Sequence, residues 1–495
     1  MKPWFARFLS RWAQMGVVEV RIHPAIGIAR VGNSVDEYFI GPERQWDRSA
    51  PADGSYKDRS HRIKRQVARF RLFAYDERGV PTELVEGPGV EITWTVHLVN
   101  AKAAARLFRP DSTRNSGYSG DALRDLVIDP GPRTVDRLHR RAEFGTGKFI
   151  LKECRPQRVP LGEIRLDDDG RLLVFGGAGA TGSPAHTSLS VQDDSDNWYD
   201  DIADGPVTAT VRINGADHPV AGSWVITAPP NFAPPVGSAI RLWDAMFDAL
   251  ATEQQKSAPP SYVDDIYPIL QAAIDSGAVA SVAKPHHHFR HPVSPRELDE
   301  QLAKVGHMPR LASGRGAALD LPLTPTQKQR MRVWAKAGNP DISWDMTWVD
   351  GPPVSKDFTP DGMDKAALEN CVGGALRPGI EAGEFLLEPA RYGPIETVNG
   401  QPSFRLDHNQ VEPGQVTAGM SLPWQADFHA CNPLWWPAPR PGQVVPAGSP
   451  PGAAPVQWNR GYSRPVFVNG GWTRMGFVTR QAEGLVETDS DPLNQ

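Results

Sequence analysis

Three residues near the carboxyl end of the chain have side chains that could together perform redox chemistry. Asp427 stands four residues before Cys431, and Trp472 follows in a Gly-Gly-Trp segment. A thiol, a carboxylate and a nearby indole are the ingredients from which a protein can build a quinone out of its own side chains. If Cys431 and Trp472 are joined, the chain carries its own redox cofactor. If they are not joined, they are a buried thiol and a core aromatic ring.

Other interpretations of the cysteine compete with this one. On composition alone, a buried structural cysteine is favoured for Cys431. His429 lies two residues before it, but the thiol and imidazole of a cysteine protease are usually distant in sequence, and no protease signature surrounds this cysteine. The chain also lacks the GxSxG elbow of serine hydrolases.

Residues 177–182 (GAGATG), which we call the glycine segment, match the spacing of a dinucleotide-binding fingerprint. That fingerprint requires a helix at its end, so that the pyrophosphate lies at the helix N-terminus. Here Ser183 and Pro184 follow, and then an acidic loop that would repel phosphate. A plain glycine-rich turn is therefore the favoured interpretation.

Two polar clusters could bind cations. His286, His287, His288 and His291 offer imidazoles to a transition metal, but neighbouring residues of an extended chain point to alternate sides, so a polar loop is favoured. The second cluster is acidic and is interpreted as a solvated loop or a pocket rim that attracts an amine, in preference to a calcium site. Its members are Asp193, Asp194, Asp196, Asp200, Asp201 and Asp204.

The pattern of apolar and turn residues predicts an α+β fold. Residues 17–235 are mainly β, with many short antiparallel strands that suggest a sandwich-like sheet region, including a hairpin turned by Asp167-Asp168-Asp169-Gly170. Residues 236–345 are mainly helical, with helices near 240–247, 262–275, 294–305 and 324–337. Residues 346–495 are expected to be irregular, with a helix near 361–371 and strands near 383–387 and 476–479. No clear linker separates these parts, so we expect a single intertwined domain over 1–495.

Composition excludes several classes of protein. The 495 residues carry a formal net charge of −5, which argues against a nucleic-acid surface. No run of eighteen apolar residues suggests a membrane span, and the first residues lack a signal-peptide core. Three cysteines cannot form a disulfide framework. A cytoplasmic location is the expectation.

A set of sequence blocks resembles the family of amino-acid oxidases that use cysteine tryptophylquinone, which includes a lysine ε-oxidase and a glycine oxidase. The blocks occur in the order of that family and span most of the chain, and their combination is far more specific than any one of them. They are residues 21–34 (RIHPAIGIARVGNS), 38–43 (YFIGPE), 126–133 (LVIDPGPR), 161–163 (LGE) with 171–177 (RLLVFGG), 198–201 (WYDD) with 204–207 (DGPV), 369–374 (ENCVGG) with 378–381 (PGIE), 423–431 (PWQADFHAC), 436–438 (WPA) and 472–478 (WTRMGFV).

The resemblance implies a role for individual residues. Cys431 matches the thioether cysteine, Trp472 the modified indole, and Asp427 the carboxylate that assists cofactor formation. Tyr199 matches an aromatic residue at the substrate entrance, where glycine-specific members have Phe, so the substrate is expected to be larger than glycine. The expected substrate pocket consists of Tyr199, Arg474, His429, Cys371 and Trp436, although Cys371 fits a core residue at a helix end equally well.

The chain departs from the family pattern in two ways. It is shorter than characterised members, especially between Cys431 and Trp472. Arg474 stands where the lysine-oxidase type is expected to have histidine, and arginine cannot exchange protons near neutral pH. Arg474 could instead bind a substrate carboxylate through two hydrogen bonds.

By this resemblance, a primary amine forms a Schiff base on the quinone made from Cys431 and Trp472, and a base removes a proton from the carbon that bears nitrogen. Dioxygen reoxidises the cofactor, which yields hydrogen peroxide and ammonia. No nicotinamide or separate metal is needed, and a flavoprotein partner is implied for maturation. Association of several copies of the chain stays open.

Two alternatives stay open beside the oxidase. One is a tailoring enzyme of secondary metabolism that uses the same cofactor to hydroxylate an amino-acid or peptide-linked substrate. The other is a binding or scaffold protein that kept the fold without the cofactor.

Overall fold

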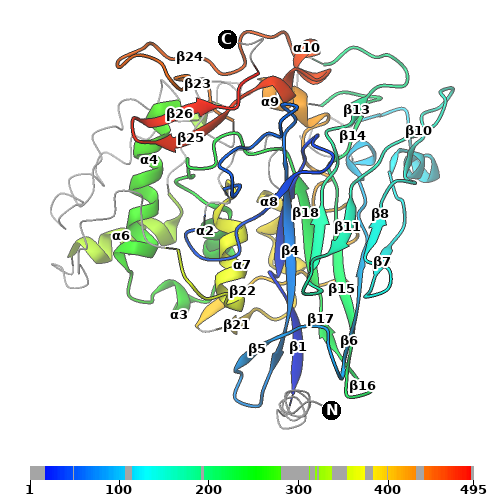
Figure 1. Cartoon of the computed structure of the whole chain (residues 1–495), viewed down its shortest axis with the longest axis vertical. Helices are drawn as coiled ribbons and strands as arrows, with labels where there is room; N and C mark the ends of the chain where they lie inside the picture. Colours follow the sequence, from blue (N-terminus) through cyan, green and yellow to red (C-terminus); the bar gives the residue numbers. More distant parts are fainter. Residues whose placement is uncertain are drawn as a thin grey trace.

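The computed structural model describes residues 17–47, 50–105, 114–190, 194–279, 311–312, 318–319, 323–336, 354–373, 383–398, 400–430 and 440–491. Within these residues, fourteen strands form one large sheet, which dominates the view in Figure 1. The main path of the sheet runs through β7 (Arg133–Val135), β6 (Val90–Val96), β15 (Asp204–Ile213), β18 (Ser223–Ala228), β2 (Ile26–Arg30), β4 (Arg65–Tyr75), β12 (Leu172–Phe175), β11 (Glu163–Leu166) and β8 (Arg141–Glu143).

Five strands branch from this path. They are β1 (Glu19–His23), β3 (Tyr38–Ile40), β5 (Pro81–Leu84), β16 (Ala216–His218) and β17 (Val220–Ala221). Six separate two-stranded ladders complete the β structure: β9 (Lys148–Phe149) with β10 (Gln157–Arg158), β13 (Thr181–Gly182) with β14 (Tyr199–Asp200), β19 (Leu311–Ala312) with β20 (Ala318–Leu319), β21 (Glu396–Val398) with β22 (Gln401–Ser403), β23 (Gln443–Val444) with β24 (Val456–Gln457), and β25 (Phe477–Gln481) with β26 (Gly484–Thr488).

The sheet curls until its two terminal strands are neighbours. β7 and β8 are consecutive in sequence, and Arg133 Nε donates a hydrogen bond of 2.9 Å to the carbonyl oxygen of Glu143. The result is a nearly closed, barrel-like sheet. The expected sandwich of two sheets is therefore corrected to one curled sheet, whereas the mixed α and β content is as expected. A sequence pattern of alternating strands fits both arrangements, because each buries one or both faces of every strand.

Alternation along the strands divides the interior into two cores. In β18, Trp224 and Ile226 belong to the core that the sheet shares with the helices, whereas Val225 between them belongs to the core enclosed by the strands. Successive side chains of a strand point to opposite faces, so the all-buried β18 separates the two cores. The sheet therefore provides a rigid wall on which the helices and the carboxyl-terminal segments pack.

The helices of the described residues are α2 (Leu242–Leu250), α3 (Glu253–Lys256), α4 (Tyr267–Val279, preceded by a π-helical turn at Tyr262–Ile266), α6 (Pro325–Lys336), α7 (Pro360–Glu369), α8 (Gly383–Leu386), α9 (Trp424–Ala430) and α10 (Arg464–Val468). In Figure 1, helices such as α2, α3, α4 and α6 lie to one side of the sheet, and α9 and α10 lie at its upper end. The predicted helices near 240–247, 262–275, 324–337 and 361–371 are confirmed. The predicted helix at 294–305 and the histidines at 286–291 lie outside the described residues.

Local capping explains why two of these helices were predictable. Thr324 and Gln327 cap each other at the start of α6, with Gln327 N donating to Thr324 Oγ1 at 3.1 Å and Thr324 N donating to Gln327 Oε1 at 3.0 Å. Thr359 accepts a hydrogen bond from Gly362 N before α7, and Pro360 takes the first helical position. The strand predicted at 383–387 is wrong, because α8 occupies that segment. The last part of the chain is also more regular than expected.

The acidic cluster is not a solvated loop over its whole length. The side chains of Asp200, Asp201 and Asp204 are fully buried, each with 0% exposure. Asp204 accepts hydrogen bonds from Thr417 N and Oγ1 and from Trp224 Nε1. Asp204 thereby attaches the chain that leads into α9 to the sheet, and burial corrects the expected pocket rim or solvated loop at all three positions.

Asp200 forms a fully buried ion pair with Lys102, at 2.5 Å between Nζ and Oδ2. We predict that Lys102→Met lowers the free energy of unfolding by about 3–5 kcal/mol, because it leaves a buried carboxylate without its counter-charge. Chemical denaturation measures the change. The matched control is Arg124→Met, since the pair of Arg124 with Asp121 is exposed, and it should leave the midpoint almost unchanged. Equal midpoints for the two variants would refute the prediction.

Among the described residues, no helix combines the length and apolar character that a membrane crossing requires.

Candidate active site

Trp472 follows α10 in the chain, and α10 lies with α9 at one end of the sheet (Figure 1). The tryptophan belongs to a 3₁₀ turn, Gly471–Arg474, and its side chain is 3% exposed. The indole of Trp424, the first residue of α9, meets it edge to face, with ring centroids 5.1 Å apart and planes at 70°. This contact fixes α9 against the candidate redox tryptophan.

Helix α9 carries Asp427 and ends one residue before Cys431. Asp427 is 1% exposed. The start of the helix is capped by a residue far away in the sequence, because Asp200 Oδ2 accepts a 3.0 Å hydrogen bond from Trp424 N. The structure therefore brings the helix of Asp427 to Trp472. Cys431 and Trp436 lie outside the described residues, so a bond between Cys431 and Trp472 stays a prediction.

The glycine segment lies against the six-membered ring of Trp472. A Cβ built on Gly179 would be 2.1 Å from Cζ2 and 2.6 Å from Cη2 of this indole. Gly179 also has φ of +84°, a conformation that side chains rarely adopt. Any residue larger than glycine at position 179 would therefore clash with two adjacent carbons of the Trp472 ring. The segment continues into β13 and opens no helix, which agrees with the plain-turn interpretation.

Several buried polar atoms around Trp472 have no hydrogen-bond partner within the described part of the chain. They are Trp424 Nε1, Gln425 Oε1 and Asp201 Oδ1. Gln425 Nε2 donates to the carbonyl oxygen of Gly179 at 3.0 Å, and Asp201 Oδ2 accepts from Gly179 N and Ala180 N at 2.7 and 2.8 Å. Buried polar groups normally have partners, so these three atoms could bond a polar group that forms or binds beside Trp472.

His429 lies on the same helix and is half-buried. Its Nε2 is 2.6 Å from the carbonyl oxygen of Tyr462, so Nε2 carries the proton and donates. Its Nδ1 has no partner within the described residues. Burial lowers the pKa of His429, so the imidazole is neutral at pH 7 with an unprotonated Nδ1.

Tyr199 is part of β14 and pairs with the end of the glycine segment, opposite Gly182. Its ring packs on Phe149 with centroids 5.5 Å apart, and burial, followed by the nearby Asp201, raises its pKa. The ladder between β13 and β14 thus links Tyr199 to the backbone that contacts Trp472.

Arg474 is exposed, two residues beyond Trp472. A hydrogen bond with Tyr462 raises its pKa. The guanidinium of Arg474 therefore lies at the surface, whereas Trp472 is buried against Trp424.

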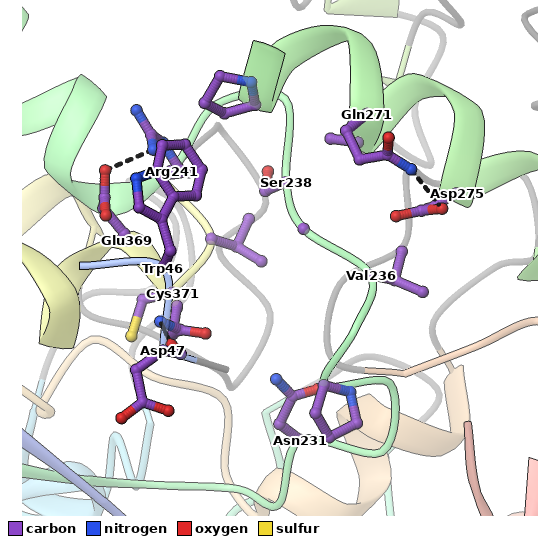
Figure 2. A pocket seen from close by; sticks show the side chains of 16 residues that line it. Trp46, Asp47, Asn231, Val236, Ser238, Arg241, Gln271, Asp275, Glu369 and Cys371 are labelled. Atoms are coloured by element: carbon purple, nitrogen blue, oxygen red, sulfur yellow. Dashed lines mark hydrogen bonds and ion pairs between the residues drawn. The ribbon is translucent and has the colours of Figure 1, made fainter. Parts of the chain in front are cut away.

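Cys371 lines a different pocket, which Figure 2 shows together with Trp46, Asn231 and Ser238. The cavity has a volume of about 60 Å³. The Cys371 thiol donates to the carbonyl oxygen of Ala367 at 3.5 Å at the end of α7. Neither Trp472 nor Asp427 is among the described residues that line this pocket, so the structure does not place Cys371 beside them. Within the described residues, no cluster of three or more metal-ligating side chains occurs.

Comparison with known proteins identifies the family. The sequence profile described as L-lysine epsilon oxidase N-terminal matches residues 23–227, and that of the L-lysine epsilon oxidase C-terminal domain matches residues 305–446. The chain belongs to the L-lysine epsilon oxidase family. The L-lysine 6-oxidase of Marinomonas mediterranea is a homologue, 26% identical in an alignment 523 residues long that covers 83% of this chain and 71% of the relative.

Solved structures of the Marinomonas mediterranea L-Lys epsilon-oxidase share the fold of this family member. One of them, described as the Schiff base intermediate with L-Lys, has a TM-score of 0.73 at 20% identity and covers 95% of both chains. Another structure of the same enzyme has a TM-score of 0.72 at 20% identity, with the same coverage. At this identity the likeness establishes the fold of the chain.

Sequence reasoning about this family member missed Gly179, Gln425 and Asp201 as parts of the site. Their role depends on close approach between segments that are far apart in sequence. The glycine segment was conspicuous, but its spacing pointed to nucleotide binding or a turn and gave no sign of an aromatic neighbour.

Proposed function

We propose that the chain is an amino-acid oxidase that oxidatively deaminates a primary amine, with a cysteine tryptophylquinone made from Cys431 and Trp472. The observation that carries this proposal is the contact of buried Trp472 with α9, the helix that carries Asp427 and ends one residue before Cys431. Family membership supports it, because a homologue is described as an L-lysine 6-oxidase. Overall, the amine, dioxygen and water would yield a carbonyl compound, ammonia and hydrogen peroxide.

The described residues fit a modified indole. An ortho-quinone needs two adjacent ring carbons, and Cζ2 and Cη2 face a position that has no Cβ. Oxygen atoms on the ring are hydrogen-bond acceptors, and the Trp424 indole N–H is a buried donor without a partner in the described part of the chain. When bound to the chain, the quinone would supply the electron sink for amine oxidation.

The remaining chemistry falls to side chains of the chain. Asp427 lies on α9, four residues before Cys431 in the sequence. We assign it the proton transfers of cofactor formation and the removal of the proton from the substrate carbon that bears nitrogen. Asp427 is 1% exposed, and exclusion of water strengthens the electrostatic interactions of its carboxylate.

Tyr199 and Arg474 are proposed to select the substrate. Tyr199 is half-buried on the strand that pairs with the glycine segment, and its ring would narrow the entrance. Arg474 is exposed two residues after Trp472, and its planar guanidinium can bind a carboxylate through two hydrogen bonds. The proposed substrates are therefore amino acids that present a primary amine to the ring and a carboxylate to the surface. A flavoprotein is proposed as the maturation partner, on the basis of the family resemblance.

Product analysis tests the proposed reaction. The protein matured in cells is incubated with a panel of amino acids, including lysine, in isotopically labelled dioxygen. Equal amounts of ammonia and hydrogen peroxide are expected, with the label in the hydrogen peroxide and none in the organic product. Label retained in a hydroxylated product would identify a tailoring hydroxylase instead, and no turnover by a protein that contains the quinone would refute the substrate class.

We predict that Asp427→Asn reduces turnover by about 10²–10⁴-fold, because an amide of nearly the same shape cannot accept the proton. Steady-state kinetics measures the loss, and intact mass reports whether the quinone still forms. Asp121→Asn is the control, since Asp121 is 94% exposed in the side chain, and it should behave like the wild type. Full activity of Asp427→Asn would remove the assigned role.

A further inference from the structure

Asp201 is a fully buried carboxylate whose two oxygens have different surroundings. Oδ2 accepts hydrogen bonds from two consecutive backbone groups of the glycine segment, Gly179 N and Ala180 N. Oδ1 has no partner within the described residues. Such an arrangement is costly for an ionised group, since burial disfavours the charged form.

The glycine segment encloses the carboxylate closely. A Cβ on Gly177 would be 2.2 Å from Asp201 Oδ2, so residue 177 leaves space for the carboxylate just as residue 179 leaves space for Trp472. The segment therefore contacts Asp201 at one glycine and Trp472 at another. A displacement of the carboxylate would be transmitted to the ring through the peptide between them.

The peptide groups of Gly179 are fixed on both sides. Its N–H donates to Asp201, and its carbonyl oxygen accepts a hydrogen bond from Gln425 on α9. The helix that carries Asp427 and the strand end that carries Asp201 thus hold the same residue against the ring. Both anchors are buried: Gln425 and Asp201 have 0% exposure.

We propose that Asp201 is a positioning residue of the redox site, which holds Gly179 against the Cζ2–Cη2 edge of Trp472 and so sets the room for oxygen at that edge. The inference rests on the proposed function. Asp201 acts through Gly179, and its role is separate from that of Asp427. A site of this kind has to be held within about 0.5 Å of its productive geometry, which explains why a buried carboxylate is kept at the cost of desolvation.

The raised pKa of Asp201 also predicts how the stability of the protein depends on pH. Burial, with a further contribution from neighbouring Asp200, raises its pKa to about 7. Of the charged and titratable groups around it, Asp200 is paired with Lys102, and Tyr199 lies on the same strand end. Since the folded state holds this proton while the unfolded state releases it near pH 4, Asp201 reduces wild-type stability as pH rises from about 4 to about 7.

The test compares Asp201→Asn and Asp201→Ala, each matured in the cells that produce the quinone in the wild type. The amide oxygen of asparagine can accept the same two N–H groups, so Asp201→Asn should keep the quinone and the wild-type absorption maximum. The melting temperature of Asp201→Asn, measured relative to that of the wild type, should also increase as pH rises from 5 to 8, because the wild type alone loses stability from this group. Asp201→Ala removes the acceptor, and the crosslinked fraction measured by intact mass should fall by about tenfold or more.

Asp58→Ala is the matched control, because Asp58 is a buried carboxylate that also accepts backbone N–H groups of its own loop, from Ser60 and Arg62. It should melt earlier and still form the quinone. If Asp201→Ala does not fold, Asp201→Glu decides, since its longer side chain pushes into Gly177 and should reduce the quinone.

Wild-type amounts of quinone in folded Asp201→Ala or Asp201→Glu, or loss of the quinone in folded Asp201→Asn, would overturn the positioning role. A wild type without quinone would instead contradict the proposed function itself.

Discussion

Cys431→Ala is expected to yield a colourless protein whose turnover is reduced by about a thousandfold or more, because neither the thioether nor the electron sink can form. The absorption spectrum and steady-state assays of the matured variant measure both effects. Trp472 should keep its unmodified mass in this variant.

The control for this prediction is Cys154→Ala. Cys154 is half-buried and packs at the edge of the core enclosed by the strands, so its loss should leave colour and turnover unchanged. Cys371→Ala is the sharper comparison. Since Cys371 lines the separate pocket of Figure 2, that variant should keep the quinone. Activity retained by Cys431→Ala would mean that the cofactor is assigned to the wrong cysteine.

Gly179→Ala is expected to lose the quinone while the protein still folds. The added methyl would lie 2.1 Å from Cζ2 of Trp472, a distance at which the ring has to move. Overpacking of this kind costs about 1–3 kcal/mol, and displacement of a reacting ring by an ångström reduces turnover by about 10²-fold. Intact mass, the visible band and chemical denaturation measure the three consequences.

Gly54→Ala separates the clash from backbone strain. Gly54 has φ of +75°, close to that of Gly179, but a Cβ there would meet nothing within 4 Å. Both variants lose stability because alanine is strained in the left-handed backbone conformation. Only Gly179→Ala also places a methyl group against Trp472, so a loss of quinone caused by that contact is specific to position 179. If Gly54→Ala and Gly179→Ala lose the quinone equally, the packing of the glycine segment on Trp472 has no part in the site.

The sequence was informative wherever a signal is local. The hairpin between β11 and β12 formed around Asp167-Asp168-Asp169-Gly170 as predicted, because the turn residues and flanking strands are adjacent. Helices α6 and α7 begin at threonine caps followed by proline, which is also a local signal. Helix α9 was missed because its first backbone N–H is capped by Asp200, more than two hundred residues earlier.

Long-range effects also explain the other errors. A segment as short as α8 can be a strand or a helix by pattern, and its surroundings decide. The clustered aspartates look like a solvated loop until the pairing of Asp200 with Lys102 and of Asp204 with Thr417 is known. Roles for Asp427 and Trp472 were assigned through the family resemblance and stay predictions, although the structure places the helix of Asp427 against Trp472. Gly179 and Asp201 could not be predicted, because their contacts exist only in the folded chain.

The most direct test of the account is peptide mass spectrometry of the matured protein after proteolysis. We predict a single crosslinked species that contains both the Cys431 and the Trp472 peptides, with two oxygen atoms gained and four hydrogen atoms lost relative to the separate peptides. Recovery of both peptides unmodified and unlinked, from a preparation that oxidises its amine substrate, would contradict the central claim.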